Sequence, residues 1–220
     1  MSQNQESIAF FLNRPVIKVR MENQWQRIGD REVRTLLSSY IGSGFFDFDV
    51  EGVKRKLESH PWVANAEVKR IWPDTLSLQL TEQIAIARWG ENKLLNQYGE
   101  IFQPSTLNGL AGLPGLTGPD KSQYDVMQQY QQLSQILFPS GLKLSELTLS
   151  RRGSWEMTLS DGLRVVMGRT DVMEKTQRFV AFYGRQVALT SSRFVSVDLR
   201  YSNGFAVQSV ESNLTGVAIR

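Results

Sequence analysis

Hydrophobic residues follow two periods along this chain, and the order of the two predicts an α+β protein. Alternation of apolar and polar residues predicts strands at residues 16–21, 63–71 and 75–81. Between the first two of these, apolar residues recur at helical spacing after Asp30 and again after Asp49, and both aspartates suit a helix N-cap. Pro61 ends the second helix, because the residue before a proline disfavours the helical region. The first part of the chain is therefore predicted as β-α-α-β-β.

The pattern changes after residue 83, where short strands and turns take over. Strands are predicted at residues 85–89, 94–95, 100–102, 144–149, 155–159 and 163–167. Two long amphipathic stretches, from Asp120 to Leu137 and from Thr170 to about Leu189, predict helices that cover this sheet. We expect four segments: a polar tether at 1–14, a small domain at 15–83, a mostly antiparallel β domain at 84–210 and a thin tail at 211–220.

The last strong pattern is the stretch from Phe194 to Val207, F-V-S-V-D-L-R-Y-S-N-G-F-A-V. Its alternation predicts two strands, and Asn203 and Gly204 fit a two-residue type I′ turn, which needs positive φ at both positions. Little sequence follows to cover this hairpin, so we expect it at a sheet edge, where it is either a hazard or a docking site.

Composition narrows the function by exclusion. The net charge is only +3, from 25 Lys and Arg against 22 Asp and Glu, and the basic residues are dispersed, which argues against a nucleic-acid binder. Cysteine is absent, so disulfides, thiolate nucleophiles and Cys-ligated metals are excluded. No apolar run approaches the roughly 18 residues that a membrane span needs. The tryptophans at 72, 89 and 155 are expected in the core.

Candidate catalytic residues are few, and each has a simpler explanation. His60 is the single imidazole and lies beside Pro61, where capping or packing is the usual role. The glycine-rich stretch 112–118 lacks the lysine of a phosphate loop. Asp47 and Asp49 have apolar neighbours where a calcium loop needs oxygen ligands. We therefore expect a protein that is no enzyme and carries no cofactor or metal.

Several motifs together resemble a known family. The stretch H-P-W-V-A-N-A-E-V-K-R-I-W-P-D-T-L-S-L-Q-L-T-E at 60–82 is similar to the second half of a POTRA domain. The segments I-A-R-W at 86–89, N-Q-Y-G-E-I-F at 96–102, R-R-G-S-W-E-M-T-L at 151–159, M-G-R at 167–169 and V-D-L-R-Y-S-N-G-F-A-V at 197–207 resemble the FtsQ/DivIB family of cell-division proteins. The resemblance covers about residues 15 to 207, in the family's order.

The resemblance implies a fold, a location and partners. Members have a short cytoplasmic tail, one membrane helix, and a POTRA domain and a β domain in the periplasm, on the outer side of the inner membrane at the division septum. This sequence departs from that pattern in having no membrane helix. We expect a truncated, periplasmic-only chain whose first 14 residues are a juxtamembrane remnant, and the alternative is a naturally soluble paralogue. The family implies a scaffold without catalysis that binds FtsB and FtsL and helps regulate septal peptidoglycan synthesis by FtsW and FtsI. FtsK and FtsN are further possible partners, and nucleic acid is not one.

The family's FtsB contact lies on the last strand of the β domain. The resemblance carries it onto the following residues of this chain: Arg200, Tyr201, Asn203, Gly204 and Phe205, with Arg151 and Arg152 in support. The turn departs from the family pattern, since S-N-G-F stands where better-known members have D-S-G-A. The alternative function is a POTRA chaperone or assembly module for outer-membrane or secreted proteins, which would require tandem repeats or a barrel.

Overall fold

The computed structural model describes residues 15–16, 18–42, 44, 48–189, 194–201, 204–209 and 217–219, the side chains of 185–189 and 217–219 excepted. The expected tether at 1–14, Asp47, and the turn residue Asn203 lie outside the described residues. The chain forms two compact units, Met1–Ile84 and Ala85–Arg220.

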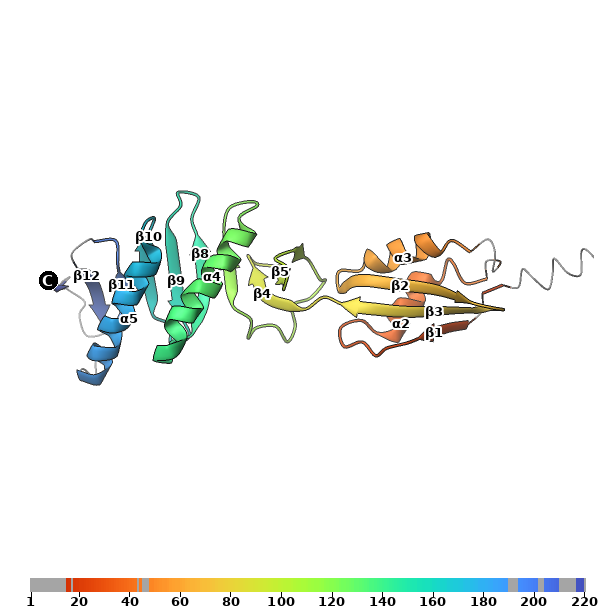
Figure 1. The fold of residues 1–220 in the computed structure, drawn as a ribbon, viewed down its shortest axis with the longest axis horizontal. Helices are drawn as coiled ribbons and strands as arrows, with labels where there is room; N and C mark the ends of the chain where they lie inside the picture. The colour runs from red at the N-terminus through yellow and green to blue at the C-terminus, as the bar shows by residue number, and fades with distance from the viewer. Residues whose placement is uncertain are drawn as a thin grey trace, which may run out of the picture. The chain divides into compact units, whose positions relative to one another are not determined.

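The N-terminal unit has the predicted order of elements (Figure 1). These are β1 (Lys18–Met21), α2 (Asp30–Leu37), α3 (Val50–Glu58), β2 (Val63–Ile71) and β3 (Thr75–Glu82). The sheet has the order β1-β3-β2, with β1 parallel to β3 and β2 antiparallel to it. Both helices pack their apolar residues onto the sheet, in a buried cluster that includes Val33, Leu57 and Leu78.

Of the two predicted helix N-caps, the one at Asp49 is confirmed and the one at Asp30 is not. Asp49 is the N-cap of α3, and its carboxylate accepts a hydrogen bond from the Gly52 N–H at 2.7 Å. Asp30 is instead the first residue of α2, after an N-cap at Gly29 that makes no side-chain cap bond. The prediction for Asp30 was wrong by one residue, and its carboxylate still lies in the first turn, where the helix dipole favours an acid. Within the described part of the chain, no helix combines the length and the apolar character that crossing a membrane requires.

The C-terminal unit is built on one mixed sheet. Its described strands are β4 (Ala85–Trp89), β5 (Lys93–Asn96), β6 (Ile101–Phe102), β7 (Gly115–Thr117), β8 (Leu144–Leu149), β9 (Trp155–Leu159), β10 (Arg164–Gly168), β11 (Phe194–Asp198), β12 (Phe205–Ser209) and β13 (Val217–Ile219). They follow the order β13-β12-β11-β10-β9-β8-β7-β4-β5-β6. Most neighbours are antiparallel, as predicted, and the parallel pairs are β4 with β7, β7 with β8, and β10 with β11.

Two helices of this unit connect parallel strands. Helix α4 (Gln123–Leu137) leads from β7 to β8, and α5 (Val172–Leu189) leads from β10 to β11. Parallel neighbours run in the same direction, so the chain must return from the end of one strand to the start of the next. A tight turn is too short for this, and a helix makes the crossover. The helices lie next to each other over the sheet (Figure 1). They close a buried cluster that includes Val126, Leu133 and Phe179, together with apolar residues of β8 to β11.

The terminal hairpin exists, but its predicted details were wrong. Strands β11 and β12 pair antiparallel, with Asp198 opposite Ala206, so six residues connect them instead of a two-residue turn. The register shifts between Phe194 and Ser196, which marks a β-bulge. The bulge explains why Val195 is exposed although Val197, two residues further on, is buried, which strict alternation does not allow.

Two further expectations need correction. The segment expected to be a thin tail contains β13, which pairs with β12, so β12 is not the edge of the sheet. Trp72 is 62% exposed beyond the end of β2, so the prediction that it lies in the core was wrong. Trp89 and Trp155 do pack against the buried cluster of the C-terminal unit.

Candidate interaction site

The predicted site residues that the structure describes lie at one end of the C-terminal sheet. Because β10 and β11 are parallel, their carboxyl ends meet there, and Val166 pairs with Asp198. The antiparallel register brings the start of β9 to the same end, with Trp155 opposite Gly168. The β8–β9 turn, which carries Arg151 and Arg152, therefore lies at this end too. About 50 positions of sequence separate the pair 151–152 from the pair 200–201, and the sheet topology places both pairs at the same end of the sheet.

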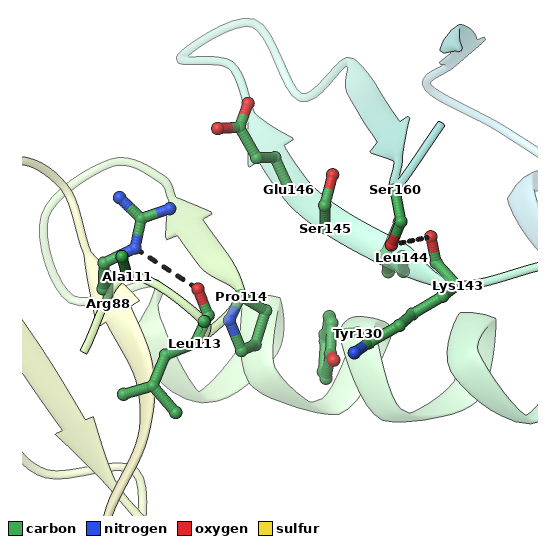
Figure 2. Close-up of a pocket in the computed structure, with 11 residues that line it drawn as sticks. Arg88, Ala111, Leu113, Pro114, Tyr130, Lys143, Leu144, Ser145, Glu146 and Ser160 are labelled. Carbon is green, nitrogen blue, oxygen red and sulfur yellow. Dashed lines mark hydrogen bonds between the residues drawn. The ribbon is translucent and has the colours of Figure 1, made fainter. Parts of the chain in front are cut away.

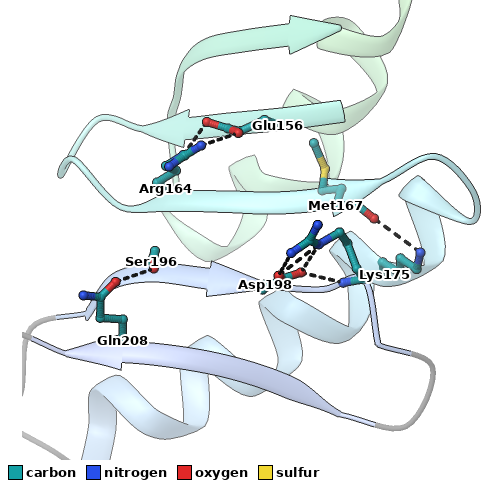
Figure 3. A network of polar contacts seen from close by, with 8 residues as sticks. Glu156, Arg164, Met167, Lys175, Ser196, Asp198 and Gln208 are labelled. Atoms are coloured by element: carbon teal, nitrogen blue, oxygen red, sulfur yellow. Dashed lines mark hydrogen bonds and ion pairs between the residues drawn. The ribbon is translucent and has the colours of Figure 1, made fainter. Parts of the chain in front are cut away.

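Arg200 is held by an acid of its own chain. Its guanidinium donates to the carboxylate of Asp198, with Nε 3.0 Å from Oδ1 and Nη2 2.6 Å from Oδ2. Its backbone N–H also donates to Oδ1, at 3.0 Å, and the dashed lines at Asp198 in Figure 3 mark these contacts. The Arg200 side chain remains 61% exposed. Arg200, which the resemblance assigns to the partner contact, therefore already pairs with a carboxylate of its own chain.

Gly168 lets the Arg200 side chain cross the end of β10. Its φ is +83°, a conformation that favours glycine, and a Cβ built there would lie 3.2 Å from Arg200 Cγ. The next residue, Arg169, is exposed and turns toward the β8–β9 turn, where its Nε lies 3.9 Å from a Cβ built on Gly153. Arg169 thus lies between the β8–β9 turn and Gly168, over which the Arg200 side chain passes.

We call the exposed set Arg151, Arg152, Arg169 and Arg200 the arginine cluster. Among the ion pairs of the described residues, Arg200 alone of the four takes part in one. Sequence reasoning missed Arg169 as a site residue, although the motif M-G-R at 167–169 was the signal that could have revealed it. It also missed Asp198, whose role depends on a contact two residues away.

The remaining predicted residues differ in their surroundings. Tyr201 is 58% exposed beside the arginine cluster. Gly204 and Phe205 are half-buried. The Phe205 ring packs on Phe182 of α5, with ring centres 5.3 Å apart, and the Arg178 guanidinium lies 5.8 Å from it. Phe205 therefore anchors β12 to α5, and Tyr201 is the aromatic residue of this set that is open to a partner.

The ion pair with Arg200 also lowers the pKa of Asp198. The hydrogen bond from the Arg200 side chain holds the pKa of Asp198 below its usual value, against the opposing effect of partial burial. A carboxyl with a depressed pKa in the folded state stabilises the fold above the pKa of the unfolded chain, and this contribution is lost as the pH falls through the folded value.

We therefore expect wild type and the Asp198→Asn variant to differ by a constant free energy of unfolding above about pH 5. The difference should shrink below about pH 4, the range in which an unfolded aspartate becomes protonated. Urea unfolding of both proteins between pH 7 and pH 3 measures it. A difference that stays the same down to pH 3 would contradict the shift.

Three other kinds of site are possible in principle: a site at the ring of His60, a small cavity and a group of metal-ligating side chains. His60 Nε2 lies 3.0 Å from the Glu32 carboxylate, and Nδ1 accepts from the Trp62 N–H, so this ring joins α2 to the end of α3 as a structural contact. A cavity of about 140 Å³ lies between Arg88, Tyr130 and Glu146 (Figure 2). Ligand sites usually enclose about 300 Å³ or more. Among the described residues, no three His, Asp or Glu side chains are grouped so that they could hold a metal ion.

Comparison with known proteins assigns both halves of the chain. Residues 87–200 match the family model for cell division protein FtsQ/DivIB, C-terminal, and residues 14–83 match the model for the POTRA domain, FtsQ-type. The chain is 35% identical to cell division protein FtsQ of Coxiella burnetii, over 88% of this chain and 80% of that protein. It is 37% identical to cell division protein FtsQ of Cellvibrio japonicus, over 94% of this chain and 65% of that protein. The cell division protein FtsQ of Hahella chejuensis is 33% identical, over 90% and 71% respectively.

Proposed function

Because the chain belongs to the FtsQ/DivIB family of non-catalytic cell-division proteins, we propose that it binds FtsB and FtsL through the arginine cluster, Tyr201 and strand β12. In this proposal both units lie on the periplasmic side of the inner membrane at the septum, and the full-length protein is anchored by a membrane helix. The scaffold holds FtsB and FtsL so that they regulate septal peptidoglycan synthesis by FtsW and FtsI. The N-terminal unit offers a second surface, for which FtsK is the candidate partner.

One observation carries this proposal: exposed arginines from three separate loops, and an exposed tyrosine, lie at the same end of the sheet. Arginine forms paired hydrogen bonds with a carboxylate, so such a cluster fits an acidic partner segment. Tyrosine supplies a large contact area at low entropic cost and is enriched among the residues that dominate binding energy. The match over residues 87–200 favours a division scaffold over the alternative of an outer-membrane assembly module.

A partner segment in extended conformation is the simplest occupant of this end of the sheet. Strand addition gives affinity through main-chain hydrogen bonds, which carry little sequence information. Side chains at the end of the strand then supply the specificity. Here Arg200 and Tyr201 follow the end of β11, and the other arginines of the cluster lie at the same end of the sheet. One partner segment could therefore run along β12 and contact these side chains.

We expect the double variant Arg151→Glu, Arg152→Glu to bind a periplasmic segment of FtsB about tenfold more weakly at low salt. The loss should be smaller at high salt, since exposed charges are screened. Calorimetry at two salt concentrations measures it, and circular dichroism confirms that the variant is folded. The control is Arg31→Glu, an exposed arginine of α2 in the other unit. Equal binding by wild type and the double variant would remove the β8–β9 turn from the interface.

A further inference from the structure

Strand β13 occupies the side of β12 that a partner strand would need. The pairing is antiparallel, with Phe205 opposite Ile219, Ala206 opposite Ala218 and Val207 opposite Val217. On its other side β12 pairs with β11. Within the described part of the chain, Ala206 and Val207 are therefore paired on both sides, and β13 is the last strand of the sheet at this edge.

We propose that β13 is an intramolecular substitute for the partner strand, which the partner must displace before it can pair with β12. This inference rests on the proposed function and concerns the regulation of the same surface. A protein whose binding-competent state is only partly populated binds with an affinity reduced by that fraction. The segment that carries β13 therefore lowers the affinity of this surface for a partner and limits pairing with the wrong one.

The two sides of β12 are unequal, which makes β13 the strand that leaves. Strand β13 has three residues and β12 as its only neighbour in the described sheet. Strand β12 is held independently, because Phe205 packs on Phe182 of α5 and Val207 packs against the buried cluster of the C-terminal unit. Removal of β13 therefore leaves β12 in place with an open edge, which is the state that accepts an added strand.

The register of β13 on β12 also predicts the direction and the residue types of the partner strand. β13 places Val217 opposite Val207 and Ile219 opposite Phe205, with the small Ala218 between them. A competing strand must make the same pairs, so it should run antiparallel to β12 and carry apolar residues, β-branched ones preferred, at two alternate positions. The acidic residues that suit the arginine cluster should lie next to this strand in the partner's sequence.

A reversible disulfide tests the displacement directly. The chain has no cysteine, so Ala206→Cys with Ala218→Cys adds the only pair. Directly opposite residues of antiparallel strands have Cα atoms about 4.5–5.5 Å apart, within the range that a disulfide spans. The oxidised form fixes β13 on β12, and reduction releases it. Binding of the periplasmic FtsB segment is measured by calorimetry for both forms, with single-cysteine Ala218→Cys under the same oxidant as control.

We expect the reduced form to bind like wild type and the oxidised form to bind at least tenfold more weakly. Equal binding by both forms, or tighter binding by the oxidised form, would overturn the inference and make β13 a bystander or a platform. In that case the proposed function stands on the binding itself. No binding by either form or by wild type would reject the proposed function, and this inference with it.

A second pair of variants gives opposite expected signs. The double variant Val217→Pro, Ala218→Pro removes two successive backbone N–H groups, one of which faces β12, because N–H groups alternate sides along a strand. It therefore disfavours strand pairing, and partner affinity should rise about tenfold if β13 is in place nine-tenths of the time. Ala218→Val raises strand propensity and should weaken partner binding. Hydrogen exchange at residues 205–207 reports the pairing without any partner. Faster exchange is expected in the double proline variant, and unchanged exchange would contradict displacement of β13.

Discussion

Replacing Phe179 by alanine is expected to lower the free energy of unfolding of the C-terminal unit by about 3–5 kcal/mol. Phe179 lies in α5 and is fully buried in the cluster that joins this helix to the sheet. Its ring centre is 5.5 Å from that of Tyr183 on the same helix. Removing the ring loses its burial and leaves a cavity that the close-packed surroundings fill only in part.

The control for this prediction is Phe138→Ala. Phe138 follows α4 in the same unit and is 82% exposed, so its loss should change the free energy of unfolding by no more than about 0.5 kcal/mol. Urea unfolding followed by tryptophan fluorescence and circular dichroism compares the variants. The N-terminal unit has its own core, so its transition should not move in either variant. A loss below about 1 kcal/mol for Phe179→Ala would show that α5 is not held by this residue.

Phe179 also links stability to the candidate site. Helix α5 connects β10 to β11, and the Phe205 ring of β12 packs on the same helix through Phe182. The helix thus positions β11, which ends at Asp198 and is followed by Arg200 and Tyr201, and also β12. A weakened α5 should reduce partner binding together with stability, whereas loss of a contact residue should affect binding alone.

The N-terminal unit could be predicted closely because its signals are local. Strands β2 and β3 are adjacent in sequence, and the pairing of Glu67 with Gln79 and of Val68 with Leu78 follows from one short turn. The cap at Asp49 is also a local contact, three residues long. Order, type and approximate bounds of these elements therefore followed from periodicity and capping alone.

The terminal hairpin was predicted less well because non-local contacts decide its shape. Strict alternation from Phe194 to Tyr201 would put Val195, Val197 and Tyr201 on one face. A bulge changes the face of Val195, and β11 ends at Asp198, whose carboxylate binds both the backbone and the side chain of Arg200. Neither the bulge nor the early end of the strand has a signal in the period of the sequence. The pairing of β13 depends equally on tertiary context.

The site itself was predictable only in part. The resemblance supplied Arg200 and Tyr201 together with Arg151 and Arg152, and the sheet topology then explained why segments so far apart in sequence belong together. Arg169 emerged from geometry, since it lies between the β8–β9 turn and Gly168. A motif marks a residue as unusual, but only the register of β9, β10 and β11 shows which other residues it meets.

Tyr201→Ala is expected to weaken binding of the periplasmic FtsB segment by about 2 kcal/mol or more, which is about thirtyfold. The side chain is 58% exposed in the free protein, so its truncation should leave the fold intact and remove contact area that a partner would bury. The matched control is Tyr98→Ala, a tyrosine of the same unit that is 67% exposed in the β5–β6 turn. Calorimetry with both variants and wild type measures the difference.

The comparison of the two tyrosines separates the surface from the residue type. Exposed tyrosines often contribute to binding without specificity. An equal loss of affinity in both variants would therefore mean that Tyr201 does not mark a specific site on this unit. A loss confined to Tyr201 places the partner at the end of β11 and β12, beside the arginine cluster. If Tyr201→Ala binds like wild type while the reversal of Arg151 and Arg152 weakens binding, the partner contacts the β8–β9 turn and not the hairpin, and β13 would then have no partner strand to exclude.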